Sequence, residues 1–136
     1  MIWMGEEFGE YKTKTIDQNK IDWQLLRNEA NRELHDYYRG LIGLRRQSPA
    51  LQTDNISFFH EGAEKRVIGY IRWNDEGSRV VVIVNLSGQF FEGYKVEGIP
   101  EDGTWHEWTS NRDCEVSGGT LVDGLPQFEA RVFVKG

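Results

Sequence analysis

The chain has 136 residues, of which 38% are apolar and 12% aromatic, enough for a hydrophobic core of ordinary size. No apolar run approaches the roughly 18 residues that cross a bilayer as a helix, so we expect no membrane partner. The 16 basic and 22 acidic residues give a formal net charge of −6, which argues against a nucleic-acid partner.

The cysteine and histidine content gives no sign of a redox or metal centre. Cys114 is the one cysteine, which excludes a disulfide within the chain and suits a reducing cytoplasm, where we expect the protein to lie. His35, His60 and His106 are well separated, and no spacing of His, Cys or Asp resembles a metal site. No glycine-rich phosphate loop is present. We therefore expect neither a metal nor a cofactor.

The chain opens with MIWMGEEFGE, in which four apolar residues precede a glycine and several carboxylates. The apolar run predicts a short buried strand over residues 1–4, and such a strand in a parallel α/β domain needs neighbours on both sides. A polar loop over residues 10–23 follows, longer than a routine connection. Residues 1–27 therefore look like the middle of a larger fold, and we expect self-association or partial disorder around them.

A long amphipathic helix is predicted over residues 32–50. Its apolar side chains recur at spacings of three and four residues. Asn28 or Asn31 can cap its start, and Pro49 forbids its continuation. Gly40 and Gly43 lie inside the pattern, where glycine is unfavourable, and their spacing indicates close packing against a neighbour.

After residue 55 the apolar period changes from 3.6 to 2, which indicates strands. "VVVIVN" is apolar throughout and predicts a central strand, whereas "FEARVFV" alternates and predicts one solvent-facing side. "NDEG" predicts a hairpin turn, and Asn111, Arg112 and Asp113 predict another turn. The pattern predicts an antiparallel β-sandwich of seven or eight strands with Greek-key-like connections. The strand-like stretches are 56–61, 66–73, 79–87, 89–96, 104–110, 114–122 and 128–136.

Two motifs in the first half carry a resemblance to a known family. Gly5, Glu7 and Gly9 match a G-x-E-x-G pattern, and residues 38–51 match Y-x-x-L-I-x-L-R-x-x-x-P-A-L. Both resemble the carboxyl-terminal end of the catalytic barrel in α-amylase-family (glycoside hydrolase 13-like) enzymes, and the sequence is most similar to the 1,4-α-glucan branching enzymes among them. The β-rich remainder is similar to the all-β domain that follows the barrel.

The resemblance implies that residues 1–51 are a remnant of a (β/α)8 barrel and that residues 52–136 are a C-terminal β-sandwich. Family members cleave α-glucosidic bonds with retention, using two carboxylates about 5–5.5 Å apart. The resemblance places those acids on earlier barrel strands, so we expect no catalytic residue and no activity in this chain. It gives Glu7, with Gly5 and Gly9, a supporting role at the substrate rim of an intact enzyme.

The residues themselves argue against Glu6 and Glu7 as an acid–base pair, because neighbours on a regular strand point to opposite faces. Exposed aromatic rings can stack on sugars, which makes Trp73, Trp105 and Trp108 candidate glucan contacts. Trp105 and Trp108 are an odd number of residues apart on a predicted strand, so we expect them to face opposite ways and at least one to lie in the core.

The sequence therefore favours a non-catalytic C-terminal part of an α-glucan-active enzyme, a branching enzyme or an α-amylase. Its expected partners are the catalytic barrel of the same protein, which it stabilises, and a starch- or glycogen-type polysaccharide. The alternative is an independent carbohydrate-binding β-sandwich module, and a third reading is a structural domain unrelated to sugars. Binding modules of this kind are all-β, so the long helix favours the first interpretation.

Overall fold

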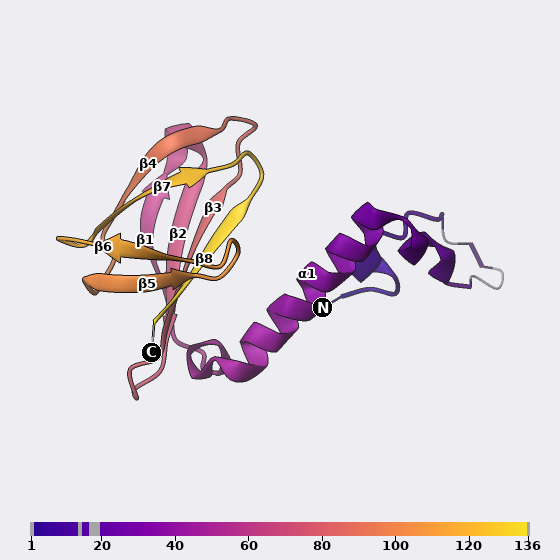
Figure 1. The fold of residues 1–136 in the computed structure, drawn as a ribbon, viewed down its shortest axis with the longest axis horizontal. Coiled ribbons are helices and arrows are strands. Elements are labelled where there is room, and N and C mark those ends of the chain that lie inside the picture. The colour runs from indigo at the N-terminus through magenta and orange to yellow at the C-terminus, as the bar shows by residue number, and fades with distance from the viewer. Residues whose placement is uncertain (1, 14, 17–19, 136) are drawn as a thin grey trace. The chain divides into compact units, whose positions relative to one another are not determined.

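The computed structural model describes residues 2–13, 15, 16 and 20–135. The chain divides into two compact units, Met1–Gln47 and Ser48–Gly136 (Figure 1). The division follows Gln47 rather than Leu51, because the 3-10 helix η3 (Pro49–Gln52) packs on strands of the second unit.

The first unit consists of the 3-10 helices η1 (Glu6–Phe8) and η2 (Trp23–Arg27) and the helix α1 (Glu29–Gln47). Asn28 caps α1, since its Oδ1 accepts the Ala30 N–H at 3.2 Å. The helix ends at Gln47, earlier than expected, because the residue before a proline disfavours helical dihedrals and Ser48 precedes Pro49. The predicted helix is thus confirmed with its bounds shifted.

The predicted strand over residues 1–4 is wrong for Ile2, Trp3 and Met4; Met1 lies outside the described residues. Ile2 and Trp3 have no regular structure and Met4 begins a turn, with 43%, 61% and 52% of their surfaces exposed. A strand needs a hydrogen-bonded neighbour, and the described residues of this unit supply none.

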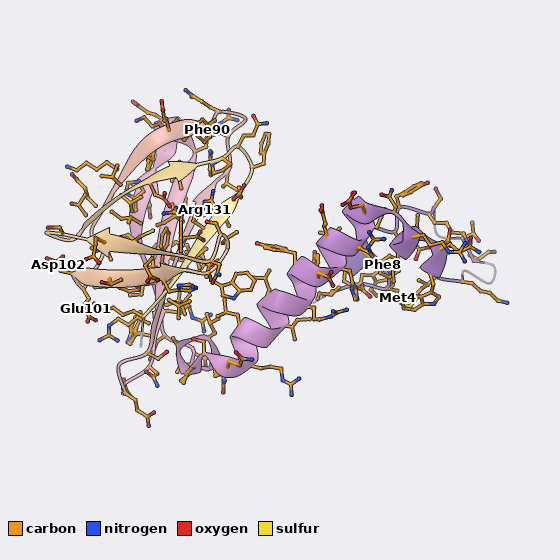
Figure 2. All side chains as sticks on the ribbon, viewed as in Figure 1. Met4, Phe8, Phe90, Glu101, Asp102 and Arg131 are labelled. Atoms are coloured by element: carbon orange, nitrogen blue, oxygen red, sulfur yellow. The ribbon has the colours of Figure 1, made fainter. Side chains whose placement is uncertain are left out.

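A single 3-10 turn stands where the strand was expected to end. Gly5 and Gly9 bracket it with φ of 83° and 74°, a left-handed conformation that glycine adopts without a steric penalty. Phe8 is fully buried in the unit, with its ring 5.3 Å from that of Trp23 (Figure 2). The Asn31 side chain donates to the Phe8 carbonyl at 2.7 Å, so this turn is anchored on α1.

The apolar face of α1 remains open in the described part of the chain. None of its residues is buried, and Leu34, Tyr37 and Ile42 expose 37%, 39% and 48% of their surfaces. A Cβ added at Gly43 would meet no atom within 4 Å, so the close packing expected at this glycine is not found.

The second unit is a β-sandwich of two antiparallel sheets, as predicted (Figure 1). The larger sheet has the order β1-β2-β3-β8-β5-β6 and the smaller one consists of β4 and β7. Strand β8 lies between β3 and β5, so strands distant in sequence are neighbours. The strands are β1 (Ile56–Gly62), β2 (Val67–Trp73), β3 (Arg79–Asn85), β4 (Phe91–Glu97), β5 (Gly103–Glu107), β6 (Arg112–Val116), β7 (Thr120–Leu125) and β8 (Ala130–Lys135), with a 3-10 turn η4 (Ala63–Lys65) after β1.

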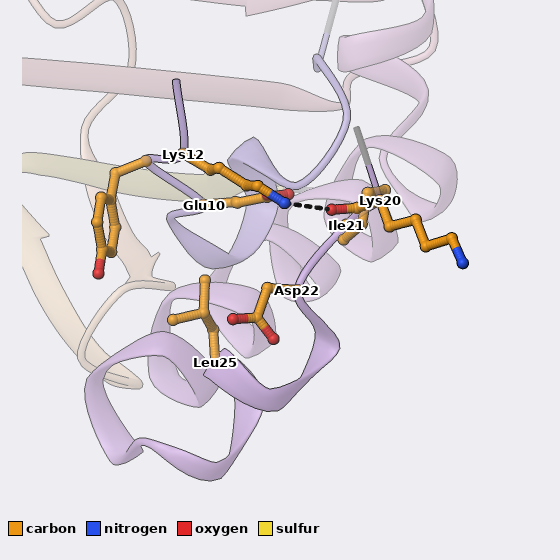
Figure 3. Close-up of a pocket in the computed structure, with 7 residues that line it drawn as sticks. Glu10, Lys12, Lys20, Ile21, Asp22 and Leu25 are labelled. Carbon is orange, nitrogen blue, oxygen red and sulfur yellow. Dashed lines mark hydrogen bonds between the residues drawn. The ribbon is translucent and has the colours of Figure 1, made fainter. Parts of the chain in front are cut away.

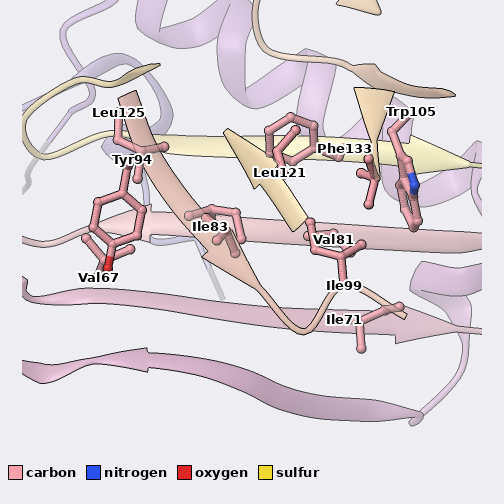
Figure 4. Packing of buried hydrophobic residues seen from close by; sticks show 12 residues of the cluster. Val67, Ile71, Val81, Ile83, Tyr94, Ile99, Trp105, Leu121, Leu125 and Phe133 are labelled. Carbon is pink, nitrogen blue, oxygen red and sulfur yellow. The ribbon is translucent and has the colours of Figure 1, made fainter. Parts of the chain in front are cut away.

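The core lies between the two sheets (Figure 4). Val81, Ile83 and Phe133 of the larger sheet pack with Leu121 and Leu125 of β7. Strand β3 is central, as its apolar run predicted, and residues Val80–Ile83 are all buried. The solvent-facing side expected for the "FEARVFV" strand is wrong at its centre, where the neighbours Val132 and Phe133, which point to opposite faces of β8, are both buried.

Of the two turns predicted from the sequence, the one at "NDEG" is found and the one at residues 111–113 is found only in part. Asn74 closes the β2–β3 turn as predicted, since its N–H donates to the Ser78 carbonyl and its Oδ1 accepts the Ser78 N–H at 2.8 Å. At the second turn only Asn111 is outside the strands, with a φ of 52°, while Arg112 and Asp113 belong to β6.

Asn85 is a fully buried amide that ties two loops together at the end of β3. Its Nδ2 lies within hydrogen-bond distance of the carbonyls of Gln89, Leu125 and Pro126, at 2.8, 3.2 and 3.0 Å. Its Oδ1 accepts from the N–H and the hydroxyl of Ser87. The strand expected to reach Ser87 therefore ends at Asn85, whose side chain directs the chain towards the smaller sheet.

Glu107 is a fully buried carboxylate that shapes the turn after β5. It accepts the N–H groups of Thr109 and Ser110 at 2.8 and 2.9 Å and the Ser110 hydroxyl. Arg131 lies 3.6 Å away on β8. These bonds bend residues that were predicted to continue the strand. Burial, the largest single effect, would raise the pKa of Glu107, but the hydrogen bonds from Ser110 and Thr109 together outweigh it and hold the pKa below its ordinary value.

Glu107→Gln should destabilise the second unit by about 3 kcal/mol at pH 7, because a buried charge partner of Arg131 is lost. A carboxyl whose pKa is lowered on folding stabilises the native state above its ordinary pKa and loses that contribution as the pH falls through the lowered pKa. The difference from wild type in urea unfolding should therefore shrink between pH 7 and about pH 3. Glu92→Gln, at an exposed position, is the control; a pH-independent difference for Glu107→Gln would contradict this account.

Gly9→Ala should destabilise the first unit by about 1–2 kcal/mol, since a left-handed backbone is costly for alanine. Its Cβ would also lie 3.3 Å from Leu34 Cδ2. Gly43→Ala is the matched control and should stabilise α1 by about 1 kcal/mol, because its Cβ meets no neighbour. Hydrogen exchange of the α1 amides measures both effects, and equal shifts of the same sign would refute the role given to Gly9.

Candidate functional site

The segment Gly5–Gly9 holds the acidic residues that the sequence singled out. Glu7 is half-buried and lines a shallow pocket of about 180 Å³ together with His35, Arg39 and two other residues of α1. Glu6 is exposed, and its Oε2 accepts the Trp3 N–H at 2.9 Å. The segment is a 3-10 helix rather than a strand, with about three residues per turn, so neighbouring side chains still diverge. The geometry supports no acid–base role for Glu6 and Glu7 as a pair.

A second pocket of about 380 Å³ lies in the first unit between residues 10–12 and 20–25 (Figure 3). Lys12 Nζ donates to the Lys20 carbonyl at 3.3 Å across it. Asp22 caps η2 by accepting the Gln24 N–H at 3.0 Å. Lys12 and Asp22 thus serve the local chain conformation, and the described residues around this pocket include no group that could hold a metal ion.

The described residues contain no group of three His, Cys, Asp or Glu side chains that could hold a metal ion. His60 lies 2.9 Å from the Tyr94 hydroxyl, and His106 lies 2.9 Å from an oxygen of Asp113, which places them in separate local contacts. Burial raises the pKa of the Cys114 thiol, which disfavours the reactive thiolate. Among the described helices, none is long and apolar enough to cross a membrane.

The three candidate tryptophans have different environments. Trp105 is 1% exposed, its Nε1 donates to the Glu101 carbonyl at 3.0 Å, and the Lys135 ammonium lies 5.5 Å from its ring centre. Its ring therefore offers no face for a sugar, and the candidate contact at Trp105 is corrected to a core position. Trp108 follows β5 and is half-buried. Trp73, at the end of β2, is half-buried and packs against the core.

Phe59 and Arg79 line the same groove as Trp73, a hollow of about 410 Å³ at the β1–β2 end of the larger sheet, and neither was singled out from the sequence. Trp73 pairs directly with Arg79 across the β2–β3 hairpin, whose turn the "NDEG" signal had located. Counting back from that turn would have placed Arg79 opposite Trp73. Phe59 lies at an irregularity in the β1–β2 pairing, between Phe58 and His60, which no sequence signal marks.

Arg79 belongs to a small charge network at this end of the sandwich. Its Nε lies 3.3 Å from Glu101, which also pairs with Lys135 at 3.0 Å. Figure 2 labels Glu101 and the neighbouring Asp102. The pKa of Glu101 is lowered, chiefly by the hydrogen bond from Lys135. The neighbouring Asp102 accepts the N–H groups of Gly118 and Gly119, which fastens the β6–β7 turn.

Known proteins resemble this chain both in amino-acid sequence and in fold. The chain is 34% identical to the 1,4-alpha-glucan branching enzyme GlgB of Bacillus cytotoxicus and 28% identical to that of Pseudomonas putida, covering 88% and 92% of this chain. It spans less than a fifth of the length of these curated relatives, 19% and 17%.

Solved structures share the fold. A crystal structure of an AmyP variant in complex with maltotriose matches 96% of this chain and 30% of its own, with a TM-score of 0.74 and 19% identity. The α-amylase of Geobacillus thermoleovorans, solved with acarbose, matches 85% of this chain and 25% of its own with a TM-score of 0.66 and 14% identity.

The family described as the alpha amylase C-terminal all-beta domain matches residues 60–131, just over half of the chain. The match begins within β1 and ends within β8, so it includes β2 to β7 in full and the first and last strands in part. The chain belongs to the family of the α-amylase C-terminal all-β domain.

Proposed function

We propose that this chain is the non-catalytic carboxyl-terminal part of an α-glucan-active enzyme, a 1,4-α-glucan branching enzyme or an α-amylase that works on glycogen- or starch-type polymers in the cytoplasm. One observation carries the proposal. The similarity to the branching enzymes named GlgB covers 88% of the chain and so involves both units, not the β-sandwich alone. An independent carbohydrate-binding module would leave the first unit without a counterpart.

The chemistry of retaining glycosidases supports a non-catalytic role. That reaction needs two carboxyl groups about 5–5.5 Å apart on either side of the sugar bond. The fully buried carboxylate of the second unit, Glu107, is occupied by the turn that it shapes. Active sites of (β/α)8 barrels draw their groups from several strand ends. The catalytic acids are therefore assigned to other parts of the full-length protein.

The role proposed for the chain is to complete and stabilise a catalytic barrel. The open apolar face of α1, with Leu34, Tyr37 and Ile42 exposed and open space at Gly43, suits burial against further barrel segments. Gly5, Glu7 and Gly9 form an anchored turn beside this helix, which suits the support of a substrate rim. The sandwich adds a rigid carboxyl-terminal domain.

The isolated chain should neither release reducing sugar from amylose nor change the iodine-stain spectrum that reports branching, whereas the full-length gene product should do one of the two. The reason is that one barrel segment cannot supply both catalytic carboxylates. Activity of the isolated chain, or its absence from the full-length product on every α-glucan tested, would contradict the proposal.

The isolated chain should self-associate through the exposed face of α1, because apolar surface of this kind drives association. Ile42→Glu should shift the chain towards monomer in sedimentation equilibrium by introducing a charge into that face. Gln47→Glu adds the same charge at the exposed end of α1 and is the control. A monomeric wild-type chain at all concentrations would refute this prediction.

A further inference from the structure

The smaller sheet is tied to the larger one by a polar contact on each of its two sides. On one side, β7 meets the edge strand β6, where Arg112 Nη2 lies 2.5 Å from both carboxylate oxygens of Asp123. On the other side, β4 meets the edge strand β1, where His60 Nε2 lies 2.9 Å from the Tyr94 hydroxyl. The first contact joins two charged groups, whereas the second joins a histidine and a neutral hydroxyl. The two contacts therefore differ in their response to pH.

His60 is half-buried in the layer between β1 and β4. It pairs with Gly69 of β2, and a Cβ at Gly69 would lie 3.1 Å from His60 Cβ, so this glycine leaves room for the histidine. The Tyr94 ring lies in the core, 7% exposed, and meets the imidazole edge-on with 5.5 Å between the ring centres (Figure 4). At the end of β4, a Cβ at Gly98 would lie 3.3 Å from Phe59 Cδ2. The surroundings of the imidazole are therefore mainly apolar.

The charges near His60 give a bound proton little compensation. Glu97 of β4 is the acid that acts on His60, but it is exposed and pairs with the lysine two residues before it at 2.6 Å. Asp123, opposite Tyr94 on β7, is already bound to β6. Lys65 of η4 adds a positive charge, with its Nζ 5.2 Å from the centre of the Tyr94 ring. Burial therefore lowers the pKa of His60 below its ordinary value of 6.5, by more than the negative charge of Glu97 raises it.

We propose that the His60–Tyr94 contact is a pH-sensitive clasp, which holds β4 against the edge strand β1 while His60 is neutral and releases β4 when His60 binds a proton. An imidazolium needs water or a counter-charge, and it gains water when β4 lifts from β1. The proton thus binds more tightly to the opened form and shifts the sandwich towards it. The Arg112–Asp123 contact keeps its charges over this range and holds β7 in place.

The direction of the pH effect follows from the lowered pKa of His60. A histidine whose pKa is lower in the closed form than in the opened form stabilises the closed form fully above its ordinary pKa. That stabilisation is lost as the pH falls from 6.5 through the lowered pKa. The pKa of Glu107 lies below its ordinary value of 4.5, so this buried carboxylate stays charged at pH 5 and does not contribute. The effect belongs to the sandwich and does not depend on the function proposed for the full-length protein.

The test combines two NMR measurements on the isotopically labelled chain. A titration of the His60 ring gives its pKa, and hydrogen exchange at pH 7.5 and pH 5 gives the protection factors of the β4 and β3 amides, corrected for intrinsic exchange. Protection in β4 should fall at pH 5 by the factor that linkage calculates from the measured His60 pKa, while β3 changes less. A His60 pKa of 6.5 or higher, or equal protection of β4 at both pH values, would overturn the proposal.

His60→Gln identifies the group that responds. Glutamine keeps a polar side chain beside the Tyr94 hydroxyl but cannot titrate, so the pH dependence of β4 protection should disappear. His106→Gln is the matched control, because His106 contacts Asp113 within the β5–β6 hairpin and does not join the two sheets. The control should keep the wild-type pH dependence. If His60→Gln keeps it as well, the proposal is wrong.

Tyr94→Phe provides a second variant, which decides the question even where His60→Gln fails to fold. It removes the hydroxyl and leaves the aromatic ring in the core. Because an imidazolium loses a stronger hydrogen bond than a neutral imidazole does, the fall in β4 protection between pH 7.5 and pH 5 should be larger than in wild type. An unchanged or smaller fall would mean that this hydroxyl is not the partner of a protonated His60, and the proposed clasp would be refuted.

Discussion

The apolar contact between two sheets of unequal width is the interaction on which the β-sandwich depends. Strand β3 is its centre, since Val80–Ile83 are buried and the strand pairs with β2 on one side and β8 on the other. The smaller sheet, β4 and β7, closes only part of this surface, and Leu121 and Leu125 of β7 complete the core. The same inequality that closes the core over β3 leaves the groove at β1 and β2 open.

Two buried polar residues allow the chain to pass repeatedly between the sheets. Asn85 binds three carbonyls from the loops that lead into β4 and out of β7. Glu107 bends the chain after β5 and lies near Arg131 of β8. Polar groups at such depth are tolerable only when their hydrogen bonds are made, so these residues link the connections between strands to the stability of the core.

The sequence predicted the fold well where the signal lies in adjacent residues. It predicted the fold poorly where a structure depends on contacts with segments distant in the sequence. The period of 2, the "NDEG" turn and the apolar run of β3 located the sandwich, because strand alternation and turn chemistry are properties of adjacent residues. The strand expected at Ile2–Met4 failed because strands need neighbours that local sequence cannot supply. Trp105 and Trp73 both stand in strand-like stretches of the sequence. Only the packing of the folded chain shows that the Trp105 ring is buried whereas Trp73 lines the groove.

We propose that this chain completes a larger α-glucan-active enzyme by burying the open face of α1. Hydrogen exchange of the α1 amides, compared between the isolated chain and the full-length gene product, tests it most directly. The account predicts that residues around Leu34 and Ile42 exchange far more slowly in the full-length protein, because their helix then packs against barrel segments. Equal protection of α1 in both proteins would contradict the account.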